Sequence, residues 1–156
     1  RHRGGQFGPL PGEALDRVEA ILGAQPWLVD LGGQLSAGGP QPDGSPWLVD
    51  IAHPVHRDAP HVQAVLRQGS LSTSGRSERG DHIVDARTGR PAAFRGSVTV
   101  WHRQGLAADA LSTALYVMGP EQGLAWAEAR DIAAMFLLPE GGGVRTLATS
   151  AWTRRR

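Results

Sequence analysis

Turn residues divide this chain into short strand-like runs, and this division limits the possible folds more than any other feature. The chain of 156 residues contains 21 Gly and 11 Pro. Runs rich in β-branched, aromatic or other apolar residues lie between the turns, at residues 27–31, 47–51, 62–66, 70–74, 97–101, 133–138 and 144–151. Consecutive runs with short connections are typical of hairpins, so we expect a mostly antiparallel sheet. Residues 27–31 and 47–51 are expected to pair across a long loop.

Helical periodicity is confined to a few segments. Apolar residues recur at helical spacing in residues 12–23, and residues 106–118 form the clearest helix of the chain. Gly119 and Pro120 separate that helix from a shorter one at residues 121–130. Helices grouped between hairpins predict an α+β fold, with two to three helices packed on the sheet.

Composition excludes several classes of function. The hydrophobic content of 40% and charged content of 20% are typical of a folded globular protein. The net charge is +1, and the short basic cluster at residues 154–156 is expected to be a solvated tail rather than a nucleic-acid-binding patch. All 16 basic residues are Arg and Cys is absent, which excludes a lysine Schiff base, a P-loop and thiolate chemistry. No apolar run approaches the roughly 18 residues of a transmembrane segment.

Asp109 and Thr113 lie one helical turn apart, so their oxygen atoms face the same side of the helix. A carboxylate and a hydroxyl in this arrangement suit a hard cation such as Mg²⁺. Ser112 lies beside them and can add another oxygen. The small residues at 105–108, just before, would let a phosphate approach closely. A structural alternative stays open, in which Asp109 only neutralises the N-terminus of the helix.

His82 precedes a turn with the sequence Asp85-Ala86-Arg87-Thr88-Gly89. Histidine is the side chain best suited to accept a proton near neutral pH. Asp85 can accept hydrogen bonds from backbone N–H groups or from Arg87. A base and a magnesium site in one small domain indicate chemistry on a phosphate ester or anhydride. The alternative is that His82 is a structural residue.

Two further groups carry weaker signals. The hydroxyls of residues 72–75 can bond a phosphate or a ribose, or simply end a strand. His53 and His56 have the spacing of a metal pair, but Pro54 lies between them and no third ligand is evident. We expect no metal site there.

Seven segments, taken in order, resemble the ApbE-like FAD:protein FMN transferases. They are residues 12–17, 28–33, 42–47, 72–75, 82–91, 97–100 and 108–115. The resemblance runs from about Gly5 to the C-terminus but matches only the C-terminal half of such a protein. Residues 1–156 are therefore expected to be a single domain, the C-terminal portion of a longer flavin transferase.

The resemblance implies a Mg²⁺-dependent transfer of FMN from FAD to a Ser or Thr hydroxyl of a partner protein, with release of AMP. It implies that His82 is the base. The metal ligands it implies are Asp109 and Thr113, with Ser112 adjacent and a backbone carbonyl from Gly8. The residues assigned to cofactor binding are Ser74, Gly75, Ser97 and Val98. Relatives are commonly exported and membrane-anchored, and some are cytoplasmic, so the compartment stays open.

The chain departs from the family pattern mainly at positions that contact the flavin. Gly5 stands where the family has an Asp, Pro11 where it has a Lys or Glu, Gln34 where it has an Asp, and Ala86 where it has a Pro. Two alternatives follow: hydrolysis of FAD to FMN and AMP, or a degenerate flavin- or protein-binding module without turnover.

Overall fold

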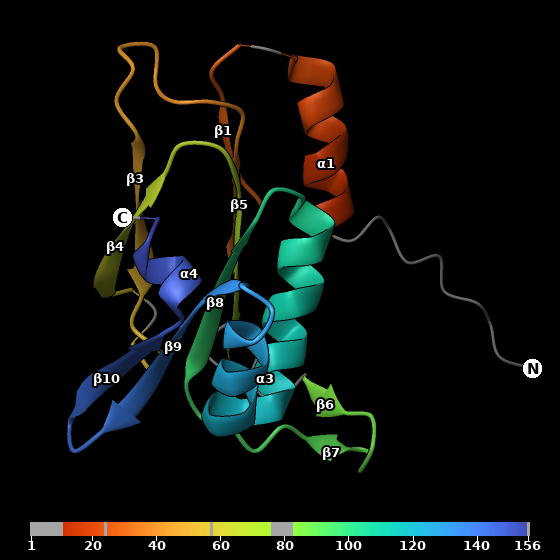
Figure 1. Cartoon of the computed structure of the whole chain (residues 1–156), viewed down its shortest axis with the longest axis vertical. Helices are drawn as coiled ribbons and strands as arrows, with labels where there is room; N and C mark the ends of the chain where they lie inside the picture. Colours follow the sequence, from red (N-terminus) through yellow and green to blue (C-terminus); the bar gives the residue numbers. More distant parts are fainter. Residues whose placement is uncertain (1–10, 24, 57, 76–82, 156) are drawn as a thin grey trace, which may run out of the picture.

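The computed structural model describes residues 11–23, 25–56, 58–75 and 83–155 (Figure 1). Its elements, in chain order, are α1 (Pro11–Leu22), β1 (Leu28–Asp30), β2 (Gln34–Ala37), β3 (Trp47–Ala52), β4 (Pro60–Leu66), β5 (Gly69–Gly75), β6 (Val84–Asp85), β7 (Arg90–Pro91), β8 (Ser97–His102), α3 (Gly105–Glu128), β9 (Ala133–Glu140), β10 (Gly143–Ala148) and α4 (Ser150–Thr153). No helix in these ranges has the length and apolar character needed to cross a bilayer.

The main sheet has six strands in the order β1-β2-β5-β8-β9-β10, and each neighbouring pair is antiparallel. Two antiparallel ribbons, β3–β4 and β6–β7, are separate from it. This arrangement confirms the predicted α+β fold with a mostly antiparallel sheet.

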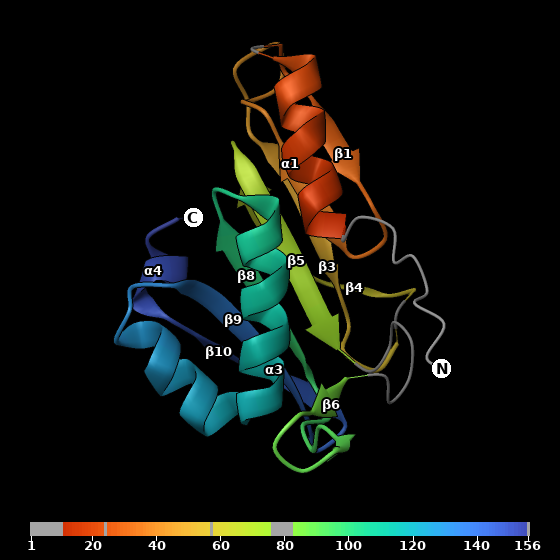
Figure 2. The same cartoon turned by 90° about the vertical axis from the view of Figure 1, so that its right-hand side faces the viewer.

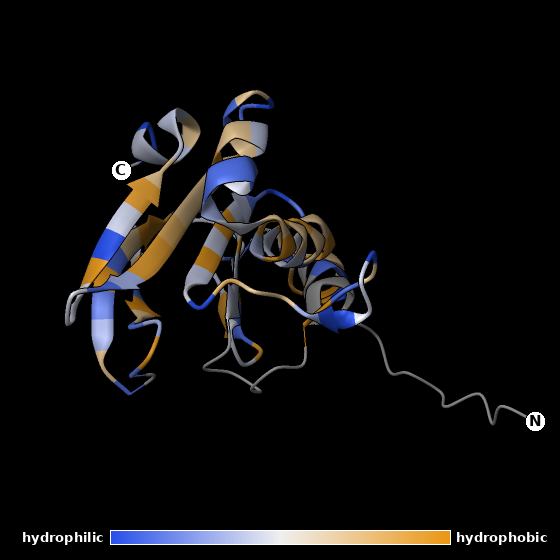
Figure 3. Ribbon diagram, turned by 90° about the horizontal axis from the view of Figure 1, so that it is seen from below, coloured by the Kyte–Doolittle hydropathy of each residue, from blue (hydrophilic) through white to orange (hydrophobic). Residues whose placement is uncertain are grey.

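The main sheet is covered on both faces (Figure 1), and Figure 2 looks onto the face that carries α3. On one face, α3 packs on a cluster that includes Val98, Val100 and Phe136. On the other face, the β3–β4 ribbon and α4 pack on alternate residues of the same strands, such as Leu71 and Met135. A strand covered on both faces is continuously apolar, and in Figure 3 β9 is hydrophobic along most of its length while the edge strand β10 alternates.

The predicted pairing of residues 27–31 with 47–51 is wrong. β1 pairs with β2, and β3 pairs with β4. The strand β2 was not predicted, because Gln34-Leu35-Ser36-Ala37 is short and half polar. A tight turn joins β1 to β2, in which the backbone N–H of Gly32 donates to the carboxylate of Asp30 at 2.9 Å. Gly32 and Gly33 have φ angles of 60° and 96°, which favour glycine.

The predicted helix break at Gly119 is confirmed. Gly119 has φ 77° and ψ 174°, so α3 consists of two helical stretches that meet at a kink. Its left-handed φ is one that glycine adopts without strain, and Pro120 is tolerated because it starts the second stretch. The terminal hairpin is also confirmed as β9–β10, but the chain then forms the short helix α4 instead of continuing as a strand.

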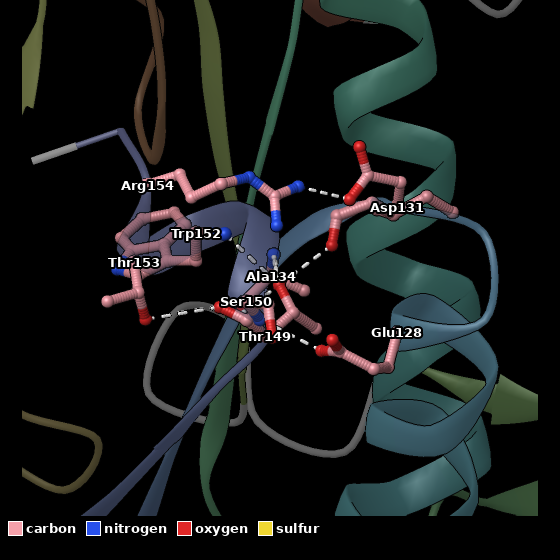
Figure 4. Close-up of polar contacts among 9 residues, drawn as sticks. Glu128, Asp131, Ala134, Thr149, Ser150, Trp152, Thr153 and Arg154 are labelled. Carbon is pink, nitrogen blue, oxygen red and sulfur yellow. Dashed lines mark hydrogen bonds and ion pairs between the residues drawn. The ribbon is translucent and has the colours of Figure 1, made fainter.

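Thr149 fixes α4 to the sheet (Figure 4). Its buried Oγ1 donates to the carbonyl oxygen of Ile132 at 2.8 Å and accepts from the N–H of Ala134 at 3.0 Å. It also accepts from the N–H of Trp152 at 3.3 Å, as the N-cap of α4. Arg154 and Arg155 therefore follow directly on a firmly held element.

Candidate functional site

A cluster of hydroxyl groups lies where α3 crosses β5. Ser112 is fully buried on the face of α3 that meets the sheet. Its Oγ lies 2.9 Å from Oγ of Ser74 and 3.2 Å from Oγ of Ser72. Because Ser112 donates its proton to the carbonyl oxygen of Asp109 at 3.0 Å, it can accept from both serines of β5. Small side chains therefore bring the helix close to the strand and satisfy each other's polar groups.

Thr113 extends this cluster to the surface. Its side chain is exposed, and its Oγ1 lies 3.1 Å from Oγ of Ser74. Asp109 is partly buried one turn earlier, on the same side of α3. The structure thus brings together four of the predicted site residues: Ser74, Asp109, Ser112 and Thr113.

The N-terminus of α3 is already occupied by a carboxylate. Asp16 of α1 accepts hydrogen bonds from the N–H of Gly105 at 2.6 Å and of Leu106 at 3.1 Å. The expected approach of a phosphate to residues 105–108 is therefore not available at these two N–H groups. Asp16 also neutralises the helix terminus, which is the structural role considered for Asp109. Asp16 lies in a segment that carries the family resemblance, but its contact with α3 was not predicted, since it lies 89 positions away from Gly105 in the sequence.

Val98 pairs with Ser74 beneath α3, directly beside the hydroxyl cluster, whereas Ser97 lies on the opposite face of the sheet. Val98 is fully buried under α3, with its backbone between β5 and β9. Ser97 points to the opposite face, where its buried Oγ finds no hydrogen-bond partner among the described residues. It lines an open cleft of about 180 Å³ between the main sheet and the β3–β4 ribbon. This volume is smaller than that of typical small-molecule sites, roughly 300–1,000 Å³.

Gly75 connects the two regions. It ends β5 directly after Ser74, and it is paired with Ser97 of β8. A β-carbon added at Gly75 would lie 3.1 Å from Cβ of Ser97 and 3.4 Å from the carbonyl oxygen of Gly96. The absence of a side chain at Gly75 therefore keeps this end of the two strands closely packed.

His82 and Gly8 lie outside the described residues. The turn that follows His82 has the predicted contacts. The Asp85 carboxylate accepts from the backbone N–H of Arg87 at 2.9 Å and forms an ion pair with its guanidinium at 3.0 Å. The hydrogen bonds from the Arg87 guanidinium are the main cause that holds the pKa of Asp85 below its ordinary value, and the bond from the Arg87 backbone N–H adds to this effect. Gly89 has φ 67°, as a tight turn requires.

Asp109 and Thr113 supply the groups at this place that suit a hard cation, because Mg²⁺ prefers oxygen ligands and retains several waters. The hydroxyls of Ser112 and Ser74 are buried and bonded within the cluster, so the structure gives them a supporting position behind these two residues. Within the described ranges, no three His, Asp or Glu side chains gather as metal ligands, which is the usual pattern for zinc. The three rings of His53, His56 and His61 lie close together on the β3–β4 ribbon without forming such a group.

Comparison with known proteins places the chain and its fold in one family. The model of the ApbE family matches residues 10–136, so the chain belongs to the ApbE family. It is 35% identical over 141 residues to the FAD:protein FMN transferase of Vibrio cholerae serotype O1, covering 83% of this chain and 42% of that relative. It is 33% identical over 149 residues to the enzyme of the same name from Escherichia coli K12, again covering 42% of the relative.

Solved structures agree. The flavinyl transferase ApbE of Pseudomonas stutzeri, in its apo form, is 41% identical with a TM-score of 0.72, over 90% of this chain and 46% of that one. The flavin transferase ApbE of Vibrio cholerae is 33% identical with a TM-score of 0.78, over 93% of this chain and 50% of that one. The chain thus spans about half or less of the length of these relatives.

Proposed function

We propose that this chain is the C-terminal portion of an FAD:protein FMN transferase and carries its Mg²⁺-binding residues. In this reaction, the FMN phosphorus of FAD loses its bond to the bridging oxygen that leaves with AMP. It gains a bond to a Ser or Thr hydroxyl oxygen of the acceptor protein. The observation that carries the proposal is the hydroxyl cluster of β5 and α3, which adjoins the carboxylate-bearing turn of Asp109. The names of the relatives support the choice of reaction.

Asp109 and Thr113 are the proposed metal ligands, with Ser112 adjacent and Gly8 offering a backbone carbonyl. Mg²⁺ bound there would neutralise part of the negative charge of the pyrophosphate, which otherwise repels the incoming oxygen. Ser74 orients Thr113, because its Oγ lies 3.1 Å from Oγ1 of Thr113 and 2.9 Å from Oγ of the buried Ser112. The residues of β5 therefore hold the ligand turn of α3 in place.

His82 is the proposed base that takes the proton of the acceptor hydroxyl. In sequence it lies seven positions after Gly75, the last residue of β5. General-base catalysis by a positioned histidine contributes on the order of 10²–10⁴-fold to a rate. The proton leaves the hydroxyl as its oxygen bonds to phosphorus.

The end of the β5–β8 pair is the proposed contact region for FAD. Ser74 and Gly75 lie on β5, and Ser97 faces them from β8 with an unpartnered hydroxyl. A ligand that crosses this end of the sheet reaches both the metal-binding turn on one face and the cleft on the other. Val98 contributes by holding the strand, since it is fully buried.

The test uses the purified chain with FAD, MgCl₂ and an acceptor domain that contains a Thr. Covalent flavin fluorescence on the denatured acceptor, together with AMP release, supports the proposed transfer. AMP without labelled acceptor indicates hydrolysis of FAD, and FAD binding without either product indicates a binding module.

Two substitutions assign the roles. D109N is expected to lower Mg²⁺-dependent activity by at least about 100-fold. The loss of a residue that only supports a metal ligand already lowers metal affinity or activity by about 10–100-fold. D58N, an exposed Asp in the β3–β4 connection, is the matched control. Substituting His82→Ala is expected to slow transfer and leave Mg²⁺ binding unchanged, as measured with Mn²⁺ by electron paramagnetic resonance. Unchanged activity and metal affinity in D109N would overturn the metal assignment.

A further inference from the structure

Arg155 is not part of a solvated tail, contrary to the expectation from sequence, whereas Arg154 is exposed. Arg155 is partly buried, and its guanidinium carbon lies 3.0 Å from the ring centroid of Trp101. The guanidinium makes no hydrogen bond or ion pair with the residues that the structure describes. Burial lowers the pKa of Arg155 to about 10, so the group still carries its charge at neutral pH. Among the residues that the structure describes, no carboxylate lies beside this partly desolvated cation, an arrangement that is costly unless a ligand compensates it.

A second stacked arginine lies at the same place. The guanidinium carbon of Arg130 lies 4.2 Å from the ring centroid of Trp126, and its Nη1 donates to the carbonyl oxygen of Trp126 at 3.3 Å. Arg130 and Arg155 line one open cleft of about 350 Å³. Stacking occupies the flat face of a guanidinium and leaves most of its in-plane N–H groups available.

The cleft has a positive excess. Its charged lining residues are Arg130, Arg154 and Arg155 with one acid, Asp131. Asp131 is bound to Arg154, as Figure 4 shows, so it does not compensate the other two arginines. His102 adds a further nitrogen donor or acceptor at the rim.

From this geometry, we propose that the cleft formed by the end of β8, the start of β9 and α4 binds an oxyanion, a phosphate group or a carboxylate. The guanidinium groups of Arg130 and Arg155 flank this cleft, and each presents N–H donors in one plane, which matches the paired oxygen atoms of a phosphate or carboxylate. The cleft is separate from the candidate metal site. His102 lies at the end of β8 away from Ser97, and Trp101 belongs to the face of the sheet opposite α3. The proposal does not depend on the proposed transferase reaction.

The test is a titration of the purified chain with inorganic phosphate, at constant ionic strength maintained with NaCl. The indole N–H signals of Trp101 and Trp126 report binding in ¹⁵N NMR spectra. We expect saturable shifts, and an affinity at least about tenfold weaker in R155Q, because a hydrogen bond between charged groups is lost. R145Q is the matched control, since Arg145 lies on β10 in an exposed pair with Glu140. A parallel titration with succinate distinguishes a carboxylate ligand from phosphate.

R130Q provides an independent second variant if R155Q disturbs the packing of Trp101. R155K keeps the charge but loses the planar fork, and we expect it to bind phosphate more weakly than the unmodified chain. Shifts that never saturate, that NaCl alone reproduces, or that persist unchanged in both R155Q and R130Q would overturn the proposal.

Discussion

The carboxylate of Asp16 accepts hydrogen bonds from the first two N–H groups of α3, at 2.6 Å from Gly105 and 3.1 Å from Leu106. The N-cap residue of α3, Gln104, contributes no side-chain bond of its own. The helix is thus capped by a residue of another helix, and α1 meets α3 at this point (Figures 1 and 2). This contact fixes the start of the helix that carries Asp109 and Thr113.

Replacing Asp16 with Ala should destabilise the chain. Loss of a capping carboxylate typically lowers the free energy of unfolding by about 0.5–2 kcal/mol, because orphan N–H groups lose their acceptor. Urea denaturation measures the change. The control is D58A, at an exposed position where a change within about 0.5 kcal/mol is expected. Equal stability of the two variants would show that Asp16 does not cap α3.

Replacing Thr149 with Val should weaken the attachment of α4. The substitution retains the shape of the side chain. It leaves the N–H of Ala134 without its acceptor and the carbonyl oxygen of Ile132 without its donor. A buried polar group left unsatisfied costs about 1–3 kcal/mol. Thermal or urea unfolding should show this loss, whereas T153V, at an exposed position of α4, should change little. A small effect in T149V would indicate that water replaces the hydroxyl.

Ser74 and Ser72 provide a matched pair for the candidate metal site. Ser74 contacts both Ser112 and Thr113, whereas Ser72 contacts only Ser112 of these two. If Ser74 orients a metal ligand, S74A should weaken Mn²⁺ or Mg²⁺ binding by about 10–100-fold, and S72A should have a smaller effect. Calorimetric titration of each variant provides the affinities. Equal affinities in both variants would argue that Ser74 serves only packing.

The histidines of the β3–β4 ribbon should make stability depend on pH. Partial burial is the main cause that holds the pKa of His53 below its ordinary value, and the neighbouring imidazoles of His56 and His61 lower this pKa further. The unfolded chain therefore binds more protons than the folded chain between these two pKa values, so stability falls as pH decreases below about 6.5. The decrease should end once pH falls below the folded pKa.

Urea midpoints measured between pH 8 and pH 5 should show this slope, and H53Q should reduce it. H102Q, remote from the ribbon, should keep it. A slope that is the same in both variants and in the unmodified chain would assign the pH dependence to other groups.

Local sequence patterns predicted the elements better than their partners. The helix over residues 106–118, its break at Gly119 and the strands at 62–66 and 97–101 follow from spacing and turn residues alone. Strand β2 was missed, and β1 was paired with the wrong strand, because Gln34–Ala37 is half polar and pairing depends on distant segments. Register across a sheet is set by tertiary packing, which local patterns do not contain.

For the candidate site too, local sequence patterns predicted features within single elements but not the contacts between distant elements. The shared orientation of Asp109 and Thr113 follows from helical spacing, and the hydroxyls of β5 were predicted either to bond a phosphate or a ribose or simply to end a strand. Three contacts were not predicted, because each joins segments far apart in the chain. They are the contact of Thr113 with Ser74, the cap of α3 by Asp16, and the stacking of Arg155 on Trp101. A terminal run of arginines appears solvated from sequence, because nothing local indicates that an aromatic ring lies within reach.

The alternation along β5 has one more consequence. Ser72 and Ser74 face α3, while Leu71 and Thr73 face the ribbon, so a slip of one residue against β8 would exchange hydroxyls for an aliphatic side chain beneath the helix. The positions of the proposed ligands on α3 are therefore set by the most deeply buried part of the molecule rather than by its loops. Such a scaffold can tolerate extensive change in its connections while these side chains stay in place.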